Sequence, residues 1–168
     1  MSGKLAVTLR PMLPSDGPEL AAIFRAAITD TASEDYSPAQ CDAWLSAADD
    51  DSAFSKRLLD ELTLLAILNR KAVGFASLRD NAHLDMLYIH PSVGRRGVAT
   101  ALVDALEILA ASRGTTLMTT DASDTARDFF ARRGYVAMRR NTVEMAGEWL
   151  GNTSMEKKLV RPQRGALQ

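Results

Sequence analysis

The chain has 168 residues, of which 46% are hydrophobic and 24% are charged, and its formal net charge is −1. This length and composition predict one domain with a single core over residues 1–160, followed by a loose tail over 161–168. The near-neutral charge argues against nucleic acid as a partner, and the lack of an apolar run of about 18 residues argues against a membrane span. The N-terminus shows no signal-peptide pattern and the single cysteine fits a reducing compartment, so we expect a cytoplasmic protein.

The N-terminal third of the chain is expected to form one strand and two or three helices. Alternating apolar and polar residues predict the strand over 5–10. Capping boxes, in which a capping side chain is followed three residues later by Glu or Gln, predict helices that begin at Asp16 and Ser37. A polar loop over 31–37 separates these two helices, and a third short helix is expected over 53–59.

The rest of the chain alternates between strands and helices. Apolar runs bounded by turn residues predict strands, and apolar residues at helical spacing predict helices. The expected strands span 62–68, 72–78, 83–90, 115–120, 135–145 and 149–159; one expected helix begins at 98 and is ended by Gly114, and another spans 124–133. The resulting order, βαα(α)βββαβαββ, predicts a mixed α/β fold.

A turn rich in Gly and Arg joins the strand over 83–90 to the following helix, and its residues 94–99 read Gly-Arg-Arg-Gly-Val-Ala. Such a turn directs several backbone N–H groups at one point, where the positive end of the helix dipole also lies, so a phosphate or pyrophosphate would fit there. No P-loop and no dinucleotide-binding fingerprint is present. The alternative interpretation is an ordinary strand-to-helix connection with arginines on the surface.

This turn resembles the signature of the GNAT superfamily of acetyl-CoA-dependent N-acetyltransferases. The family pattern is Gln or Arg, two residues, Gly, one residue, and then Gly or Ala. Gly97 and Ala99 match the pattern, whereas Gly94 stands in place of the leading Gln or Arg. The resemblance covers most of the chain, from about residue 5 to 159, and includes the segments Asp121-Ala122-Ser123, Phe129-Phe130 and Gly134-Tyr135. It implies the GNAT fold, with a mostly antiparallel mixed sheet of about six to seven strands and flanking helices.

The resemblance also implies acetyl-CoA as the acetyl donor and assigns residues to it. The pantetheine arm would pair with the strand residues Leu87, Tyr88 and Ile89, with the Leu87 N–H polarising the thioester carbonyl. The pyrophosphate would lie on the turn, against Arg95, Arg96, Gly97, Val98, Ala99 and Thr100. Phe130 stands where many family members have a tyrosine acid, and it is expected to line the pantetheine channel.

A base is needed because an amine attacks only as the free base, and an alkylammonium resembling lysine has a pKa of about 10.4. Strand alternation predicts His83, Asp85, Leu87 and Ile89 on one face and Tyr88 on the other. Asp85 is a charge between apolar neighbours in a predicted central strand, so it is the stronger candidate. It would act either as a base whose pKa burial raises, or as the group that holds the substrate's cation. His83 has the more suitable ordinary pKa of about 6.5, but it is equally read as a surface residue at a strand start.

Two further residues have open assignments. Tyr36 lies in the loop over 31–37, which forms the acceptor wall in the family. It is a candidate acid or substrate contact, or simply a packed tyrosine. Asp121 either caps the helix that follows it or faces the acceptor pocket. If both base and acid are weak, the acceptor would be an amine of low pKa, such as an arylamine or a hydrazine.

The predicted activity is transfer of an acetyl group from acetyl-CoA to a primary amine, with a small molecule favoured. The amine would attack directly in a ternary complex, without an acyl-enzyme. The alternative is a catalytically weak acyl-CoA sensor or partner-binding module on the same fold. Two histidines and one cysteine predict no metal site, and the last strand pair is a candidate edge for a homodimer.

Overall fold

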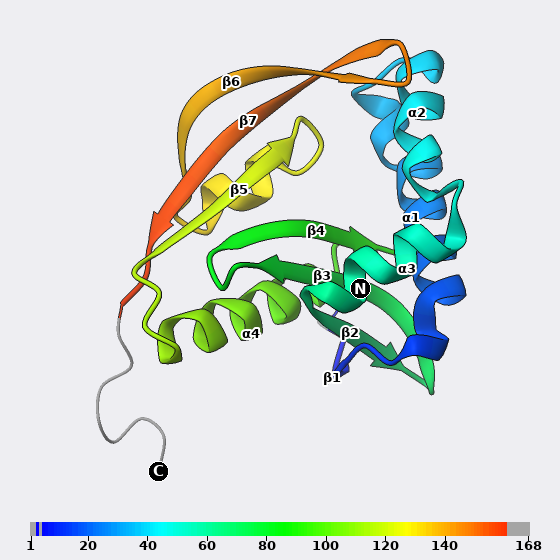
Figure 1. Cartoon of the computed structure of the whole chain (residues 1–168). Coiled ribbons are helices and arrows are strands. Elements are labelled where there is room, and N and C mark those ends of the chain that lie inside the picture. Colours follow the sequence, from blue (N-terminus) through cyan, green and yellow to red (C-terminus); the bar gives the residue numbers. More distant parts are fainter. Residues whose placement is uncertain (1–2, 4, 161–168) are drawn as a thin grey trace.

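Seven strands form one sheet in the order β1-β2-β3-β4-β5-β7-β6, and β4 and β5 are its one parallel pair (Figure 1). This computed structural model describes residue 3 and residues 5–160, so the expected tail over 161–168 lies outside the described residues. The strands are β1 (Thr8–Pro11), β2 (Leu62–Leu68), β3 (Lys71–Arg79), β4 (His83–Ile89), β5 (Leu117–Ser123), β6 (Val136–Met145) and β7 (Glu148–Lys158). The helices are α1 (Gly17–Asp30), α2 (Pro38–Leu45), α3 (Asp51–Asp60), α4 (Val98–Ser112) and α5 (Arg127–Arg132). The predicted mixed α/β fold and mostly antiparallel sheet are confirmed.

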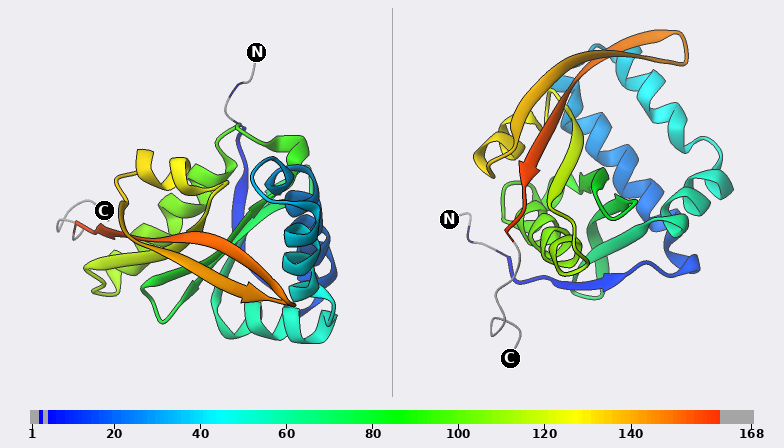
Figure 2. Two further views of the ribbon diagram at one scale, coloured as in Figure 1. Left: turned by 90° about the horizontal axis from the view of Figure 1, so that it is seen from above. Right: turned by 60° about the vertical axis from the view of Figure 1, so that its left-hand side comes forward.

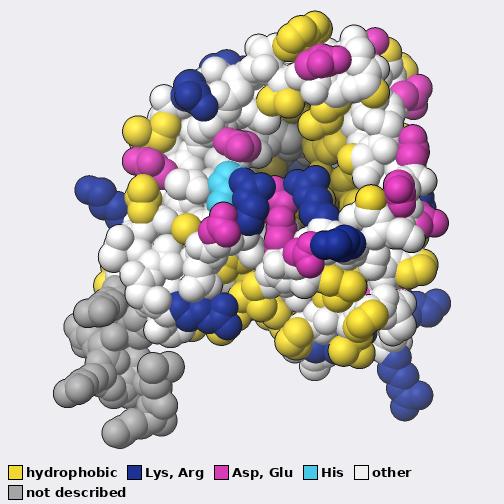
Figure 3. Space-filling view, in the orientation of Figure 1, with side chains coloured by type: hydrophobic (Ala, Val, Ile, Leu, Met, Phe, Trp, Pro, Cys, Tyr) yellow, Lys and Arg dark blue, Asp and Glu magenta, His cyan; other side chains and the backbone are white. Residues whose placement is uncertain are grey.

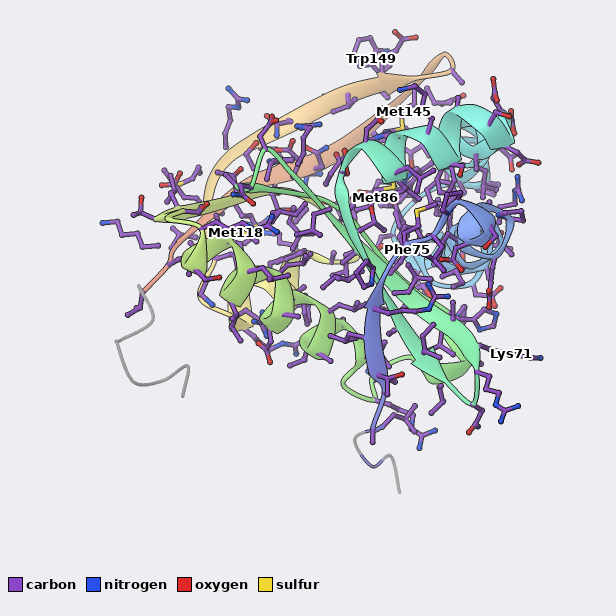
Figure 4. The ribbon with its side chains drawn as sticks, turned by 60° about the horizontal axis from the view of Figure 1, so that its bottom comes forward. Lys71, Phe75, Met86, Met118, Met145 and Trp149 are labelled. Carbon is purple, nitrogen blue, oxygen red and sulfur yellow. The ribbon has the colours of Figure 1, made fainter. Side chains whose placement is uncertain are left out.

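Helices cover both faces of the sheet, and each face has its own core. On one face α1 and α3 bury Phe24 and Leu58 against Phe75 of β3, while on the other face α4 buries Leu102. Figure 4 shows these two layers, with Phe75 and Met86 directed toward α1 and α3. Each fully buried large apolar side chain stabilises the fold by about 1.5–3 kcal/mol, so both faces are held by the hydrophobic effect.

A bulge in β4 sets which side chains reach which face. Ser77 pairs with Met86 and Leu78 pairs with Leu84, so Asp85 is an extra residue without a partner on β3. An extra residue in one strand shifts the alternation of the side chains beyond it. The alternation expected from a regular strand therefore does not continue through the middle of β4.

The side chains of β4 consequently divide differently from the sequence prediction. Tyr88 packs in the same core as Met86, on the side of α1, whereas Leu87 and Ile89 pack on the side of α4. Tyr88 and Asp85 also line one cavity. The prediction that Asp85 shares a face with Leu87 and Ile89, and that Tyr88 points away from it, is wrong. A single bulge is the reason, and no local signal in the sequence marks it.

Several element boundaries also differ from the prediction. The first strand begins at Thr8 rather than at residue 5, and β5 continues past 120 to Ser123. The capping box at Ser37 is confirmed, because Ser37 Oγ accepts from the Gln40 N–H at 3.1 Å and Gln40 Oε1 accepts from the Ser37 N–H at 2.9 Å. Within the part of the chain that is described, no helix is both long and apolar enough to cross a membrane.

The capping box expected at Asp16 is not formed. The Asp16 carboxylate accepts from the Leu13 N–H at 2.7 Å and from Arg10 Nη1 at 2.8 Å, so it joins β1 to the turn before α1. Glu19, the expected partner in the box, accepts instead from the Ala72 N–H at 2.8 Å. Asp16 thus bonds the turn that precedes α1 and the Arg10 side chain of β1, and Glu19 bonds the backbone of β3; these contacts replace the predicted capping box.

Candidate active site

The parallel strands β4 and β5 separate soon after they begin. Only His83 with Thr119 and Leu84 with Thr120 are paired, although each strand continues for several more residues (Figure 2). Beyond these two pairs, the facing edges of both strands have no strand partner within residues 5–160. An unpaired strand edge accepts an extended, amide-containing ligand in place of the missing strand.

Backbone direction identifies the groups of β4 that face this gap. The His90 N–H donates to the Val73 carbonyl of the β3 strand at 2.8 Å. Because backbone groups alternate in direction along an antiparallel strand, Tyr88 also faces β3, while Leu87 and Ile89 face away from it. The N–H and C=O groups of Leu87 and Ile89 are therefore directed at the gap, as the expected pantetheine site requires.

The turn before α4 has the backbone geometry of an anion cradle. Arg95 has φ 60° and Gly97 has φ 86°, so two residues close together adopt the left-handed conformation. Along the described chain, no acceptor bonds to the backbone N–H of Arg95, Arg96 or Gly97, and α4 begins at the next residue, Val98. Successive free amides at a helix N-terminus form a concave site for a phosphate. The turn thus fits the pyrophosphate that the sequence analysis placed there.

A cavity of about 210 Å³ lies next to the gap, between β4, β5, the first helices and the β6–β7 hairpin. Figure 3 shows the hollow on this face, with hydrophobic side chains on its wall and charged ones across its floor. Its aromatic lining is Phe24, Tyr36, Trp44 and Tyr88; its aliphatic lining includes Met86, Val143, Met145 and Leu150; and its polar lining includes Arg57, Asp85, Asp121, Ser123 and Asn152. Such a mixture of aromatic walls and few polar groups is typical of small-molecule sites.

Asp85 is held at the floor of this cavity by two arginines. Its carboxylate accepts from Arg57 Nη2 at 2.8 Å and Nε at 3.2 Å, and Arg79 Nη1 lies at 3.5 Å, while the Asp85 side chain is 8% exposed. Burial alone would raise the pKa of Asp85, but the adjacent Glu61 carboxyl, the hydrogen bonds from Arg57 and the charges of both arginines lower it overall. Burial acts in the expected direction, but the net shift is downward, so the expectation of a raised pKa for Asp85 is wrong.

Glu61 is a part of the site that the sequence analysis missed. It lies between α3 and β2, and its Oε2 atom is buried without a hydrogen-bond partner among the residues described. Burial and the adjacent Asp85 carboxyl raise the pKa of Glu61 to about 7. The one signal in the sequence was an acidic residue directly before a buried strand. A helix end of this kind normally exposes its acidic residues to water, so the signal was weak.

His83 lies beside the cavity and contacts it through Asp121. His83 Nδ1 is 2.8 Å from Thr119 Oγ1, and Nε2 is 3.8 Å from Asp121 Oδ2. Asp121 lies within β5 rather than at a helix start, and it accepts from Ser154 Oγ at 2.8 Å. Of the two roles considered for Asp121, capping is thus wrong, and it lines the cavity.

Tyr36 joins three separate segments at the cavity wall. Its hydroxyl donates to the Gly151 carbonyl of β7 at 2.7 Å and accepts from the Asp124 N–H at 2.9 Å. Burial raises the pKa of Tyr36 above its ordinary value. The one hydroxyl proton is already donated to the Gly151 carbonyl, so in this arrangement Tyr36 forms part of the cavity wall and holds the β6–β7 hairpin over the cavity.

We expect Tyr36→Phe to destabilise the protein by about 2–4 kcal/mol, because the Gly151 carbonyl and the Asp124 N–H would each lose a partner in a poorly hydrated place. Thermal unfolding measures this loss. Tyr88→Phe is the matched control, since the Tyr88 hydroxyl makes a single side-chain contact, from Trp44 Nε1 at 3.1 Å. An equal or larger loss in Tyr88→Phe would contradict the role assigned to Tyr36.

Phe130 lies away from this cavity. It is 2% exposed, belongs to the core on the α4 side, and packs against Tyr135 with ring centroids 5.1 Å apart. Asp85, Tyr36 and Tyr88 are therefore brought together at the cavity, while His83 lies next to it and Phe130 does not line it. Among residues 3 and 5–160, no group of three or more His, Cys, Asp or Glu side chains is placed to hold a metal ion.

Comparisons with known proteins show what the whole chain is similar to. Residues 32–159 match the model of the acetyltransferase (GNAT) domain. The uncharacterized N-acetyltransferase YafP of Escherichia coli (strain K12) is 39% identical over 152 residues, which make up 90% of this chain and 96% of YafP.

Solved structures show the same fold. The crystal structure of a GCN5-related N-acetyltransferase from Rhodopseudomonas palustris, described as "Aminotransferase, Class-II", is 53% identical with a TM-score of 0.91, over 93% of this chain and 98% of that one. The PaiA N-acetyltransferase of Thermoplasma acidophilum, solved in complex with coenzyme A, is 17% identical with a TM-score of 0.74, over 92% and 99% of the two chains. At this lower identity the likeness concerns the fold alone.

Proposed function

This chain belongs to the GNAT family of N-acetyltransferases, and we propose that it transfers an acetyl group from acetyl-CoA to the primary amine of a small molecule. The observation that carries the proposal is the aromatic cavity with Asp85 at its floor, placed directly beside the unpaired edge of β4. Donor and acceptor would meet where the gap and the cavity adjoin. Positioning of two substrates in one complex then supplies much of the rate.

The donor site is proposed from backbone groups. The free amides of Arg95, Arg96 and Gly97 would hold the pyrophosphate, and the groups of Leu87 and Ile89 that face the gap would pair with the pantetheine arm. Acetyl-CoA supplies the acetyl group as a thioester. A backbone N–H directed at the thioester carbonyl, as we propose for Leu87, stabilises the charge that develops there.

The acceptor site favours a small amine with an apolar or aromatic body. A volume of about 210 Å³ is below the range of about 300–1,000 Å³ that is usual for drug-sized ligands. The β6–β7 hairpin extends over the site and is tied to the first helices through Tyr36 and through Gln40, whose Nε2 donates to the Trp149 carbonyl at 2.8 Å. The hairpin over a cavity of this volume leaves little room for a protein tail.

We propose that Asp85, which borders the cavity, accepts the proton of the acceptor amine. The leaving thiolate needs little help, because a thiol of pKa about 8.5 leaves readily. The lack of a hydroxyl at Phe130 therefore does not argue against catalysis.

Release of the coenzyme thiol on an amine panel tests the proposed function. We expect turnover of small arylalkylamines and arylamines, and none of polyamines or of peptides with a free N-terminus. Arylamines are already deprotonated at neutral pH, so their kcat/KM should be flat between about pH 6 and 8. For arylalkylamines kcat/KM should rise over the same range.

The same panel distinguishes the alternative function. Calorimetric titration with acetyl-CoA reports binding independently of turnover. Micromolar binding without thiol release on any amine would favour a catalytically weak acyl-CoA sensor over an enzyme. A cytoplasmic location and a homodimer formed through the β6 edge stay predictions, and size-exclusion chromatography with light scattering measures the second of these.

A further inference from the structure

Glu61 is a carboxyl group close to the cavity, and it has no role in the reaction proposed above. It directly precedes β2, in which Thr63 pairs with Ser77 of β3. Because side chains alternate along a strand, Glu61, Thr63 and Ser77 lie on the face covered by α1 and α3. The bulge in β4 turns Asp85 toward this same face. The sheet therefore places the two carboxyl groups next to each other, with Asp85 at the cavity and Glu61 behind it.

Two buried polar atoms in this corner have no partner among the described residues, namely Glu61 Oε2 and Ser77 Oγ. Buried side-chain oxygens normally have a hydrogen-bond partner, so a buried carboxyl oxygen without a partner needs an explanation. A proton shared between Glu61 and Asp85 provides it, because a protonated carboxyl donates to an ionised one. Two adjacent carboxyl groups in a poorly hydrated place often hold one proton between them.

Two arginines make the doubly ionised state of the pair accessible as well. Arg57 reaches Asp85 from α3 at 2.8 Å, and Arg79 lies 3.5 Å from it on β3. Two guanidinium groups balance two carboxylates, so loss of the shared proton leaves no net charge in the corner. Burial and the Asp85 carboxyl raise the pKa of Glu61, whereas the positive charge of Arg57 lowers it. The pair is thus suited to gain and lose one proton near neutral pH.

We infer that Glu61 and Asp85 act as one proton-holding pair, in which Asp85 meets the acceptor amine and Glu61 keeps the proton behind it. This inference rests on the proposed function. An N–H bond of the substrate ammonium breaks, its electron pair stays on nitrogen, and the proton forms an O–H bond within the doubly ionised pair. After the product leaves, the proton passes from the pair to water. Glu61 acts through Asp85 and is therefore a positioning residue.

Other titratable groups face this corner and could produce a similar pH dependence. His83 of β4 pairs with Arg79 on the adjacent strand β3, and its side chain contacts Asp121 of β5. The Tyr88 hydroxyl also lies on this side of β4. Variants must therefore separate Glu61 from His83.

The first measurement follows the carboxyl groups directly and needs no acceptor. In protein with ¹³C-labelled glutamate carboxyls, Glu61 is assigned as the signal lost in Glu61→Gln. We expect it to titrate near pH 7, while exposed glutamates titrate near about 4.3. In Asp85→Asn the Glu61 signal should titrate at lower pH, because the neighbouring negative charge is gone. A Glu61 signal that titrates near 4.3 in the wild type would overturn the inference.

The second measurement is the pH dependence of kcat/KM with an arylalkylamine. In the wild type it should rise through about pH 7, and in Glu61→Gln this rise should disappear, with kcat/KM roughly 10- to 100-fold lower at pH 8. Glu61→Asp keeps a carboxyl group and should restore a rise. Asp60→Asn is the matched control, since Asp60 is the exposed neighbour paired with Lys56. A wild-type profile retained in Glu61→Gln but lost in His83→Gln would also overturn the inference.

Stability provides a readout that separates proton binding from a loss of folding. A carboxyl whose pKa is raised on folding binds more protons in the native state, so the wild-type unfolding free energy should fall as pH rises from about 4.5 to 7. Glu61→Gln should lack this decline. Failure of all amines to turn over would defeat the proposed function alone, because the carboxyl titration would still decide whether the pair holds a proton.

Discussion

Gly97→Asp is expected to abolish measurable binding of acetyl-CoA in a calorimetric titration, a loss of at least about 100-fold, or about 2.7 kcal/mol. Gly97 has φ 86°, and it directly precedes α4 in the turn whose amides bond no acceptor among the described residues. A carboxylate there would fill the anion cradle with a negative charge and repel a pyrophosphate. The left-handed conformation adds a backbone cost of about 1–2 kcal/mol for a side chain with a Cβ atom.

Gly114→Asp is the matched control for this change. Gly114 has φ 95°, follows the other end of α4, and has no heavy atom within 4 Å of the Cβ position. Its backbone cost is therefore similar, but it lies away from the cradle. Thermal unfolding should show comparable losses of stability in the two variants. Equal loss of binding in both would mean that the turn does not hold the coenzyme.

Asp85→Asn is expected to lower kcat/KM for an arylalkylamine by about 10²- to 10⁴-fold, the usual contribution of a positioned proton acceptor. The neutral amide accepts no proton from the amine and leaves Arg57 and Arg79 without their carboxylate. The affinity for acetyl-CoA should stay close to that of the wild type, because the donor site is built from backbone groups. Steady-state kinetics and calorimetry on the same preparation measure both quantities.

Asp16→Asn controls for the structural part of that loss. The Asp16 side chain is also 8% exposed and paired with an arginine, at 2.8 Å from Arg10, but it lies outside the cavity. Both variants should lose stability, at about 1–3 kcal/mol each, through a weakened charge-assisted hydrogen bond. Only Asp85→Asn should lose turnover. Comparable kcat/KM values for the two would show that Asp85 has a structural role only.

Part of the geometry around the proposed site could be predicted from the sequence. The turn over 94–99 was placed between a strand and a helix and interpreted as a phosphate site, and the structure gives it left-handed residues and free amides. The family resemblance assigns Leu87 and Ile89 to the pantetheine arm, and the backbone groups of these two residues face the gap. These signals are local, because a turn and a strand are encoded by contiguous residues.

Other assignments failed where a contact beyond the local helix-capping or turn pattern decided the outcome. The cap expected from Asp16 was replaced by its pair with Arg10, and the helix cap considered for Asp121 became a position within β5. The Tyr36 hydroxyl, a candidate acid, donates its hydrogen bond to the Gly151 carbonyl of β7. In each case the competing partner lies outside the sequence window in which a cap or a turn is recognised.

The sequence by itself determined the order of strands and helices, the mixed α/β class and the position of the turn that we propose as an anion cradle. Periodicity, capping and glycine at a turn are properties of neighbouring residues, so they are readable without a fold. Only the tertiary structure decided which carboxyl group has the raised pKa. The bulge at Asp85, the arginines of α3 and β3, and Glu61 at the start of β2 come together from distant segments. The pKa of a buried group depends on such surroundings, and these exist only after the sheet has formed.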